Sequence, residues 1–160
     1  MKQIDNKLLD ELTEKAKVSP RGRMNFNLHS ELNDPVQRLC NAFEPGSYIR
    51  PHRHSEPETS EVFLMLRGSA ALLFFDDSGR VAERAMLSAR GPAIAAEIPP
   101  QTWHAMASLE SGTVFFEVKQ GPYVPPKGRN VAEWAPEEGE PSAARVVEWY
   151  KIAQIGDTLP

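Results

Sequence analysis

Three of the four histidines in this 160-residue sequence lie in two short segments that together could bind a metal ion. His52 and His54 are two residues apart, and His104 follows a proline-led turn. Alternate residues of a strand project to the same face, so a strand over residues 47–54 would present both of the first two imidazoles to one point. Imidazole with carboxylate is a ligand set for divalent zinc, iron, manganese or nickel.

A carboxylate to complete this site is available in Glu58 or Glu61. Pro57 argues against one continuous strand from the histidines to Glu61, so residues 55–60 are expected to turn the chain back antiparallel. That turn would return Glu61 beside the histidines. Glu61 opens an apolar run, where an unpaired glutamate is costly, whereas Glu58 lies in the polar turn. Glu61 is therefore the favoured fourth ligand.

Counting in steps of two back from His52 places Tyr48 and Arg50 on the ligand face. There Arg50 would bind an anionic group, and Tyr48 would serve as a hydrogen-bonding or acid/base group. The alternative is that the strand end twists or bulges and Arg50 pairs with a surface glutamate. His29, outside these segments, is expected to be a surface or hydrogen-bonding histidine. Three apolar residues are expected to wall the cavity: Phe63, Met65 and Met106.

The elements that must position these side chains are short apolar runs separated by turn residues. The runs cover residues 36–43, 47–54, 61–67, 69–75, 81–87, 93–98, 103–108 and 113–119. Glycine, proline and aspartate separate most of them. Several short strands at such close spacing predict an all-β antiparallel sandwich or barrel.

A helix is expected at each end of the chain. Over residues 5–17, Asp5 or Asn6 can cap a helix whose leucines form one apolar stripe. Residues 142–154 have a helical pattern too, although the β-prone residues 146–150 leave a short strand open. The predicted organisation is an N-terminal helix and lead-in segment in 1–35 and a β-barrel in 36–120. A Pro-rich tail and a C-terminal helix packed on the barrel follow in 121–160.

Composition excludes several other classes of protein. The chain is 41% hydrophobic and 25% charged, and its length fits one domain with a real core. Its 18 basic and 22 acidic side chains leave a formal charge of −4, which provides no basic surface for nucleic acid. No apolar run is long enough to cross a membrane, and Cys40 is the only cysteine. We therefore expect a soluble, cytoplasmic protein without nucleic-acid or membrane partners.

The residues around the histidines resemble the two sequence motifs of the cupin superfamily. The first motif has glycine, five residues, His-x-His, a spacer, glutamate, six residues and glycine, and it is matched by Gly46, His52, His54, Glu61 and Gly68. Residues 99–104 resemble the second motif, Pro-x-Gly-x-x-His, with Gln101 in place of the glycine. The spacer from His54 to Glu61 is longer than usual, and Ser108 stands where asparagine is common. The resemblance implies a single cupin-type double-stranded β-helix, or jelly-roll barrel, with a metal bound by three histidines and one glutamate.

The N-terminal helix, residues 38–42 and 48–54, and the tail Trp134-Ala135-Pro136 also resemble the WbuC family of cupin-fold metalloproteins. That resemblance implies a role in surface-polysaccharide (O-antigen) biosynthesis, and the resemblance to cupin barrels in general implies a homodimer. Its ligand would be a small polar molecule such as an anionic sugar derivative or nucleotide sugar, and its activity that of an isomerase or epimerase. Two alternatives stay open: an iron-dependent dioxygenase, and a non-catalytic metal-dependent binding or sensor module.

Overall fold

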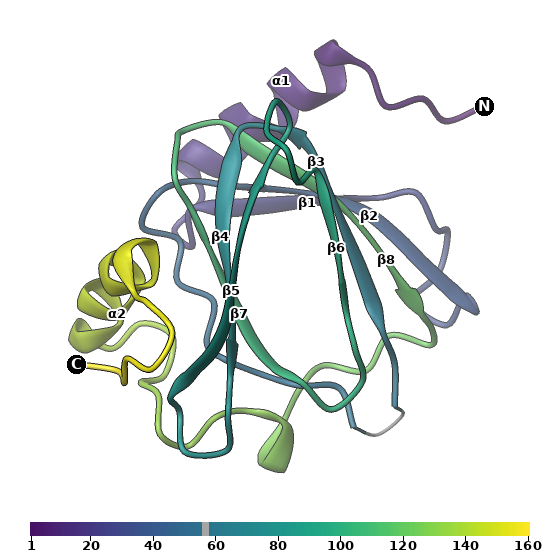
Figure 1. The fold of residues 1–160 in the computed structure, drawn as a ribbon. Helices are drawn as coiled ribbons and strands as arrows, with labels where there is room; N and C mark the ends of the chain where they lie inside the picture. The colour runs from purple at the N-terminus through teal and green to yellow at the C-terminus, as the bar shows by residue number, and fades with distance from the viewer. Residues whose placement is uncertain (56–57) are drawn as a thin grey trace.

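The computed structural model describes residues 1–55 and 58–160. Its elements, in chain order, are α1 (Asn6–Val18), β1 (Arg23–Asn27), β2 (Val36–Phe43), β3 (Glu61–Arg67), β4 (Ser69–Phe75), β5 (Val81–Ser88), β6 (Ala95–Ile98), β7 (Trp103–Ser108), β8 (Thr113–Gln120), the short 3₁₀ helix η1 (Gly128–Asn130) and α2 (Pro141–Ile152). The strands form two antiparallel sheets that face each other around an interior (Figure 1). One sheet has the order β1-β2-β8-β3-β6 and the other β5-β4-β7.

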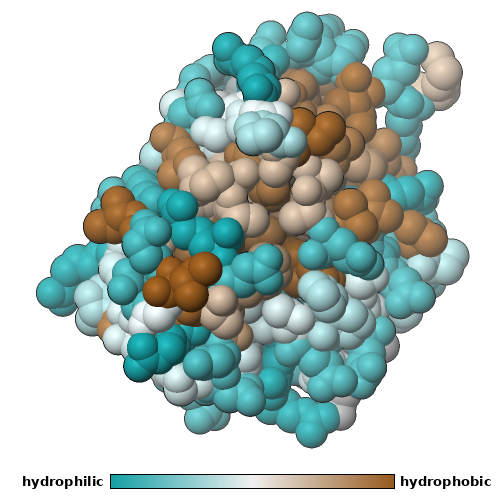
Figure 2. All heavy atoms as spheres, in the orientation of Figure 1, coloured by the Kyte–Doolittle hydropathy of each residue, from teal (hydrophilic) through white to brown (hydrophobic). Residues whose placement is uncertain are grey.

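The core has two layers because β4 is covered on both faces. Leu72 and Phe74 point to the interior between the sheets, while Leu73 and Phe75 pack with Tyr150 of α2 outside the barrel. This double burial explains why β4 is apolar throughout instead of alternating with polar residues. Figure 2, in the same orientation as Figure 1, shows hydrophobic residues toward the middle of the molecular surface that faces the viewer, with mostly hydrophilic residues around them.

Both terminal helices form where they are expected. The Asp5 carboxylate caps α1 by accepting the Leu8 amide hydrogen at 2.9 Å, and Leu9 and Leu12 pack in a buried cluster with residues of β2. Residues 146–150 belong to α2, so the alternative of a short strand there is wrong. Within the described part of the chain, no helix has both the length and the apolar character needed to cross a membrane.

Most of the expected strands are confirmed, some with ends displaced by one or two residues, but two segments differ. Residues 47–54 form no regular strand, and within them only His52 makes isolated bridges, to His104 and Val131. Pro51 lacks an amide hydrogen and cannot donate to a ladder there. Conversely, residues 23–27, which the sequence places in the lead-in segment before the barrel, form β1 and pair with β2. The expected turn includes Glu56-Pro57, which lies outside the described residues.

The motif glycines occupy backbone conformations that suit glycine. Gly46 has φ +99° and Gly68, which joins β3 to β4, has φ +73°. A Cβ atom on Gly68 would overlap the Thr113 side chain, so the turn has no room for a side chain. Gln101 has φ +62°, the left-handed conformation that the glycine of the second motif would adopt without strain.

Candidate metal centre

The structure brings His52, His54 and His104 together inside the barrel. His104 lies on β7, and His52 pairs with it through two backbone hydrogen bonds, in which each amide donates to the other carbonyl at 3.1 and 2.9 Å. The ring centroids of these two residues are 4.4 Å apart. One ligand nitrogen from each of the three histidines lies within 4.8 Å of the other two. The His54 carbonyl in turn accepts a hydrogen bond from the Gln101 amide at 3.0 Å, so backbone pairing between the two motif segments positions both His52 and His54.

Backbone carbonyls orient two of the rings. Nδ1 of His52 lies 3.0 Å from the Arg50 carbonyl, and Nδ1 of His104 lies 2.9 Å from the Thr102 carbonyl. A carbonyl only accepts, so these contacts assign the proton to Nδ1 and the lone pair to Nε2. Nε2 of His104 is buried and has no hydrogen-bond partner among the described residues. A buried imidazole nitrogen with a free lone pair is a candidate metal ligand.

Burial keeps these imidazoles neutral. Desolvation, followed by the neighbouring His104, lowers the pKa of His52 to about 3, and desolvation also lowers the pKa of His104. Both rings are therefore unprotonated at neutral pH, which is the form that binds a metal. The donor set fits a divalent cation of the zinc, iron, manganese or nickel class.

Glu61 lies beside the cluster at the start of β3 and is only 2% exposed. Its carboxylate lies in contact with His54 Nε2 and 3.4 Å from Lys119 Nζ. Burial disfavours the charged carboxylate, but the contacts with His54 and Lys119 outweigh it and lower the pKa of Glu61. Glu61 does not belong to the group whose ligand atoms all lie within 4.8 Å of one another.

The other candidate carboxylate, Glu58, lies in the loop before β3. It is exposed and accepts a hydrogen bond from Gln101 Nε2, so it connects the two motif segments at the surface. Glu61 is thus the one of the two carboxylates that adjoins the histidines, as its place at the start of an apolar strand indicates.

The histidines open onto a cavity of about 600 Å³ between the two sheets. Phe63, Met106 and Phe115 give it an apolar floor beside His52 and the other histidines. The expectation that Phe63 and Met106 wall the cavity is therefore confirmed. Met65, expected there as well, is buried in the hydrophobic core and does not line the cavity.

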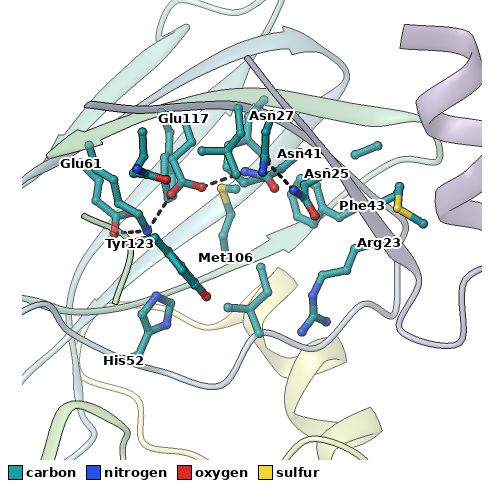
Figure 3. Close-up of a pocket in the computed structure, with 18 of the residues that line it drawn as sticks. Arg23, Asn25, Asn27, Asn41, Phe43, His52, Glu61, Met106, Glu117 and Tyr123 are labelled. Carbon is teal, nitrogen blue, oxygen red and sulfur yellow. Dashed lines mark hydrogen bonds and ion pairs between the residues drawn. The ribbon is translucent and has the colours of Figure 1, made fainter. Parts of the chain in front are cut away.

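A polar wall on the same cavity was not foreseen from the sequence. Glu117 and Lys119 of β8 line the cavity together with Asn41 of β2, and Figure 3 shows Glu117 and Asn41 across the cavity from His52. Lys119 Nζ lies 2.9 Å from Glu117, and Asn41 donates to Glu117 at 2.8 Å. Burial and the Glu61 charge raise the pKa of Glu117. The available signal was a pair of charged residues two positions apart in the otherwise apolar run 113–119.

Tyr48 and Arg50 are not among the residues that line this cavity. Tyr48 stacks on Tyr150 of α2 and donates a hydrogen bond to the Pro136 carbonyl at 2.9 Å, and burial raises its pKa to about 12. Arg50 donates to the Ala132 carbonyl at 3.0 Å and lies 3.6 Å from Glu137. Counting in steps of two requires a regular strand, which this segment does not form, so the two side chains point elsewhere. Arg50 follows the alternative in which it pairs with a glutamate.

Solved structures share this fold. KdgF from Halomonas sp. matches with a TM-score of 0.50 at 20% identity, over 67% of this chain and 85% of that chain. TT1209 from Thermus thermophilus matches with a TM-score of 0.52 at 20% identity, over 75% and 97%. A mutant salicylate 1,2-dioxygenase from Pseudoaminobacter salicylatoxidans, in complex with gentisate, matches with 0.55 at 11% identity, over 74% of this chain and 33% of that one. At these identities the likeness concerns the fold alone.

Two facing antiparallel sheets with terminal helices, and histidines inside the barrel, define the class as a single-domain cupin fold with a candidate metal centre. A family model described as "Domain of unknown function (DUF6016)" matches residues 4–87, just over half of the chain. The chain belongs to that family. Among curated proteins, none matches the sequence.

Proposed function

We propose that this protein binds a divalent metal ion through His52, His54 and His104, with Glu61 as the carboxylate of the set, and uses it to bind a small polar ligand. The convergence of three imidazole nitrogens within 4.8 Å in a buried cavity carries the proposal. When bound, such an ion supplies a Lewis acid that polarises a carbonyl or hydroxyl oxygen. On a five- or six-coordinate metal, four protein ligands would leave one or two coordination positions open, as a binding or catalytic site requires.

The chain's own residues would complete the ligand site. The apolar floor of Phe63, Met106 and Phe115 excludes water from one side of the cavity. Lys119 bridges Glu61 and Glu117, so it holds both buried carboxylates in place, and their negative charges raise its pKa although burial lowers it. Lys119 is therefore a positioning residue that fixes the Glu61 carboxylate beside the histidines.

The proposed ligand is a sugar or nucleotide sugar, and the proposed activity is that of an isomerase or epimerase in surface-polysaccharide biosynthesis. Support for the carbohydrate comes from the resemblance to the WbuC family. Arg50 and Tyr48 were the sequence candidates for contacts with an anionic group and for acid/base work. Both residues are engaged outside the cavity, so neither is proposed as a contact of the ligand. Mass spectrometry of nucleotide sugars incubated with the metal-loaded protein tests turnover directly.

Elemental analysis of protein purified without added metal tests the centre itself. We expect stoichiometric metal in the wild type and near-complete loss in His52→Ala. His29→Ala is the matched control, because His29 lines the cavity but does not belong to the three-histidine group. Full metal occupancy in His52→Ala would overturn the proposed centre.

A second candidate function is iron-dependent dioxygenation, favoured by the three-nitrogen ligand group and the aromatic residues around it. Phe63 lies 6.5 Å from His104 between ring centroids. Anaerobic iron loading followed by oxygen uptake with gentisate, the ligand of the structurally similar dioxygenase, tests it. Ligand binding without turnover in either assay would favour a non-catalytic binding or sensor module.

We also propose a cytoplasmic homodimer, on the basis of the single cysteine and of the resemblance to cupin proteins. Sedimentation equilibrium at micromolar concentration is expected to show the dimer. A monomer alone under these conditions would contradict it.

A further inference from the structure

A row of amide side chains lines the cavity where β1 joins β2. Asn25 and Asn27 come from β1, and Asn41 comes from β2. The register pairs Asn25 with Asn41, and Asn41 in turn with Phe115 of β8, so these side chains share the inner face of the sheet. We call Asn25, Asn27 and Asn41 the amide wall; Figure 3 shows it with Glu117 on one side of the cavity and His52 on the other.

The amide wall keeps hydrogen-bonding capacity for a ligand. Asn25 Nδ2 donates to Asn27 Oδ1 at 2.7 Å, and Asn41 Nδ2 donates to Glu117 Oε2 at 2.8 Å. Each amide has two N–H donors and one carbonyl acceptor. The two bonds therefore leave the carbonyl oxygens of Asn25 and Asn41 as acceptors, and the Asn27 amide group as a donor, facing the same cavity.

The charged residues near the amide wall are already paired with one another. Arg21 and Arg23 both contact Glu138, and Lys119 contacts Glu61 and Glu117. Three cations thus balance three carboxylates, so this part of the cavity does not select for a net charge. Neutral groups that both donate and accept, as hydroxyl groups do, match the mixture of free carbonyls and N–H groups.

The apolar floor continues beneath the amide wall. Phe43 and Phe115 pack edge to face with ring centroids 5.3 Å apart, and Phe63 packs against Phe115 at 4.7 Å. A saturated ring with equatorial hydroxyls has polar edges and apolar C–H faces, which fits amides beside aromatic side chains. A cavity of about 600 Å³ has the volume of a small-molecule site.

His29 is a separate indication that a polar ligand group could bind at this end of the cavity. It is 4% exposed and lines the cavity, and its Nε2 has no hydrogen-bond partner among the described residues. Its Nδ1 lies 3.0 Å from both the amide nitrogen and the carbonyl oxygen of Arg38. Whichever ring nitrogen carries the proton, Nε2 is a buried polar atom without a protein partner among the described residues.

We infer that the amide wall binds the hydroxyl groups of a neutral, polyhydroxylated ring, the end of the ligand away from the metal. This inference rests on the proposed function, in which the metal ion binds one end of the ligand. It adds the chemical class of the other end, which the amide wall recognises. Asn25 is exposed, and Asn27 and Asn41 are half-buried, so water reaches these amides in the free protein. A purely apolar ring, or an anion without hydroxyls, would displace that water without replacing its hydrogen bonds, which costs binding free energy.

Two matched pairs of probes test this in the metal-loaded protein. Quinate is cyclohexanecarboxylate with added ring hydroxyls, and myo-inositol stands in the same relation to cyclohexanol. We expect calorimetric titration to show tighter binding of the hydroxylated member of each pair. Asn25→Ala and Asn41→Ala are each expected to weaken binding of quinate and myo-inositol by about tenfold, which is the effect of one or two lost hydrogen bonds. Neither variant should change the affinity for cyclohexanecarboxylate or cyclohexanol. Asn6→Ala, at the exposed start of α1, is the control, and it should not change the affinity for any of the four probes.

Several results would overturn the inference: equal affinity for both members of each pair, equal weakening of both by the variants, or no binding of any probe at millimolar concentration. Myo-inositol and cyclohexanol have no carboxylate for the metal to bind, so their binding is also measured in chelator-treated protein. Metal-free wild type that still prefers myo-inositol would support the amide wall even if elemental analysis refuted the metal centre. If the metal-loaded wild type has full metal content but binds myo-inositol no better than cyclohexanol, the amide wall is refuted and the metal centre is not.

Discussion

Acidification should destabilise the metal-free protein through His52. Burial lowers the pKa of this imidazole from its ordinary value near 6.5 to about 3. As the pH falls below 6.5, the unfolded chain takes up a proton at this residue while the folded chain does not, so the stabilisation is complete above that pH and is lost below it. The loss is about 1.4 kcal/mol per pH unit, or about 2 kcal/mol at pH 5.

Urea unfolding of chelator-treated protein at pH 7 and pH 5, followed by tryptophan fluorescence, measures this loss. The comparison protein is His52→Gln, whose amide does not titrate. Other groups, including His104 and Glu117, titrate in both proteins, so the difference between the two pH-dependent losses isolates His52. We expect the wild type to lose about 2 kcal/mol more than the variant between the two pH values.

Equal losses in the two proteins would refute the reasoning. They would mean that His52 protonates in the folded protein as readily as in the unfolded one. Such an imidazole would be open to water, and the description of His52 as a neutral ligand would not hold.

Three further substitutions test the turns and the boundary of the centre. Gly68→Ala should cost about 2–4 kcal/mol in urea unfolding, because its Cβ would overlap Thr113 at a positive φ; a loss below about 1 kcal/mol would contradict this. Gln101→Gly should raise the melting temperature by relieving a left-handed residue, a gain of up to about 1 kcal/mol, and a lower value counts against it. Tyr48→Phe should cost about 1 kcal/mol through the lost bond to Pro136 and leave the metal content unchanged; metal loss would place Tyr48 in the centre.

The strands could be predicted where an apolar run lies between clear turn residues. Residues 61–67 and 69–75 form β3 and β4 with the expected bounds because Gly68 separates them and only glycine fits the turn. Residues 47–54 are also expected to form a strand, yet they form none. Regular pairing needs a neighbouring chain along the whole segment, and this segment is bridged by His104 and Val131 at His52 alone.

The same limit applies to the candidate site. His52, His54 and His104 could be selected because ligand type and spacing are local properties, and one backbone pairing between distant segments brings them together. The directions of Tyr48 and Arg50 depended on a strand period that the fold does not supply.

The sequence by itself determined the barrel class, the ends of most elements and the residue types able to bind a metal, because alternation, turn residues and ligand chemistry are written within a few positions of the chain. The tertiary structure alone decided that Glu61 is held by Lys119, and that Asn25, Asn41 and Glu117 face one cavity. Those relations join strands far apart in the chain. The pairing of β1 with β2 and of β2 and β3 with β8 fixes them, and the pattern within one segment does not say which distant segment it will pair with.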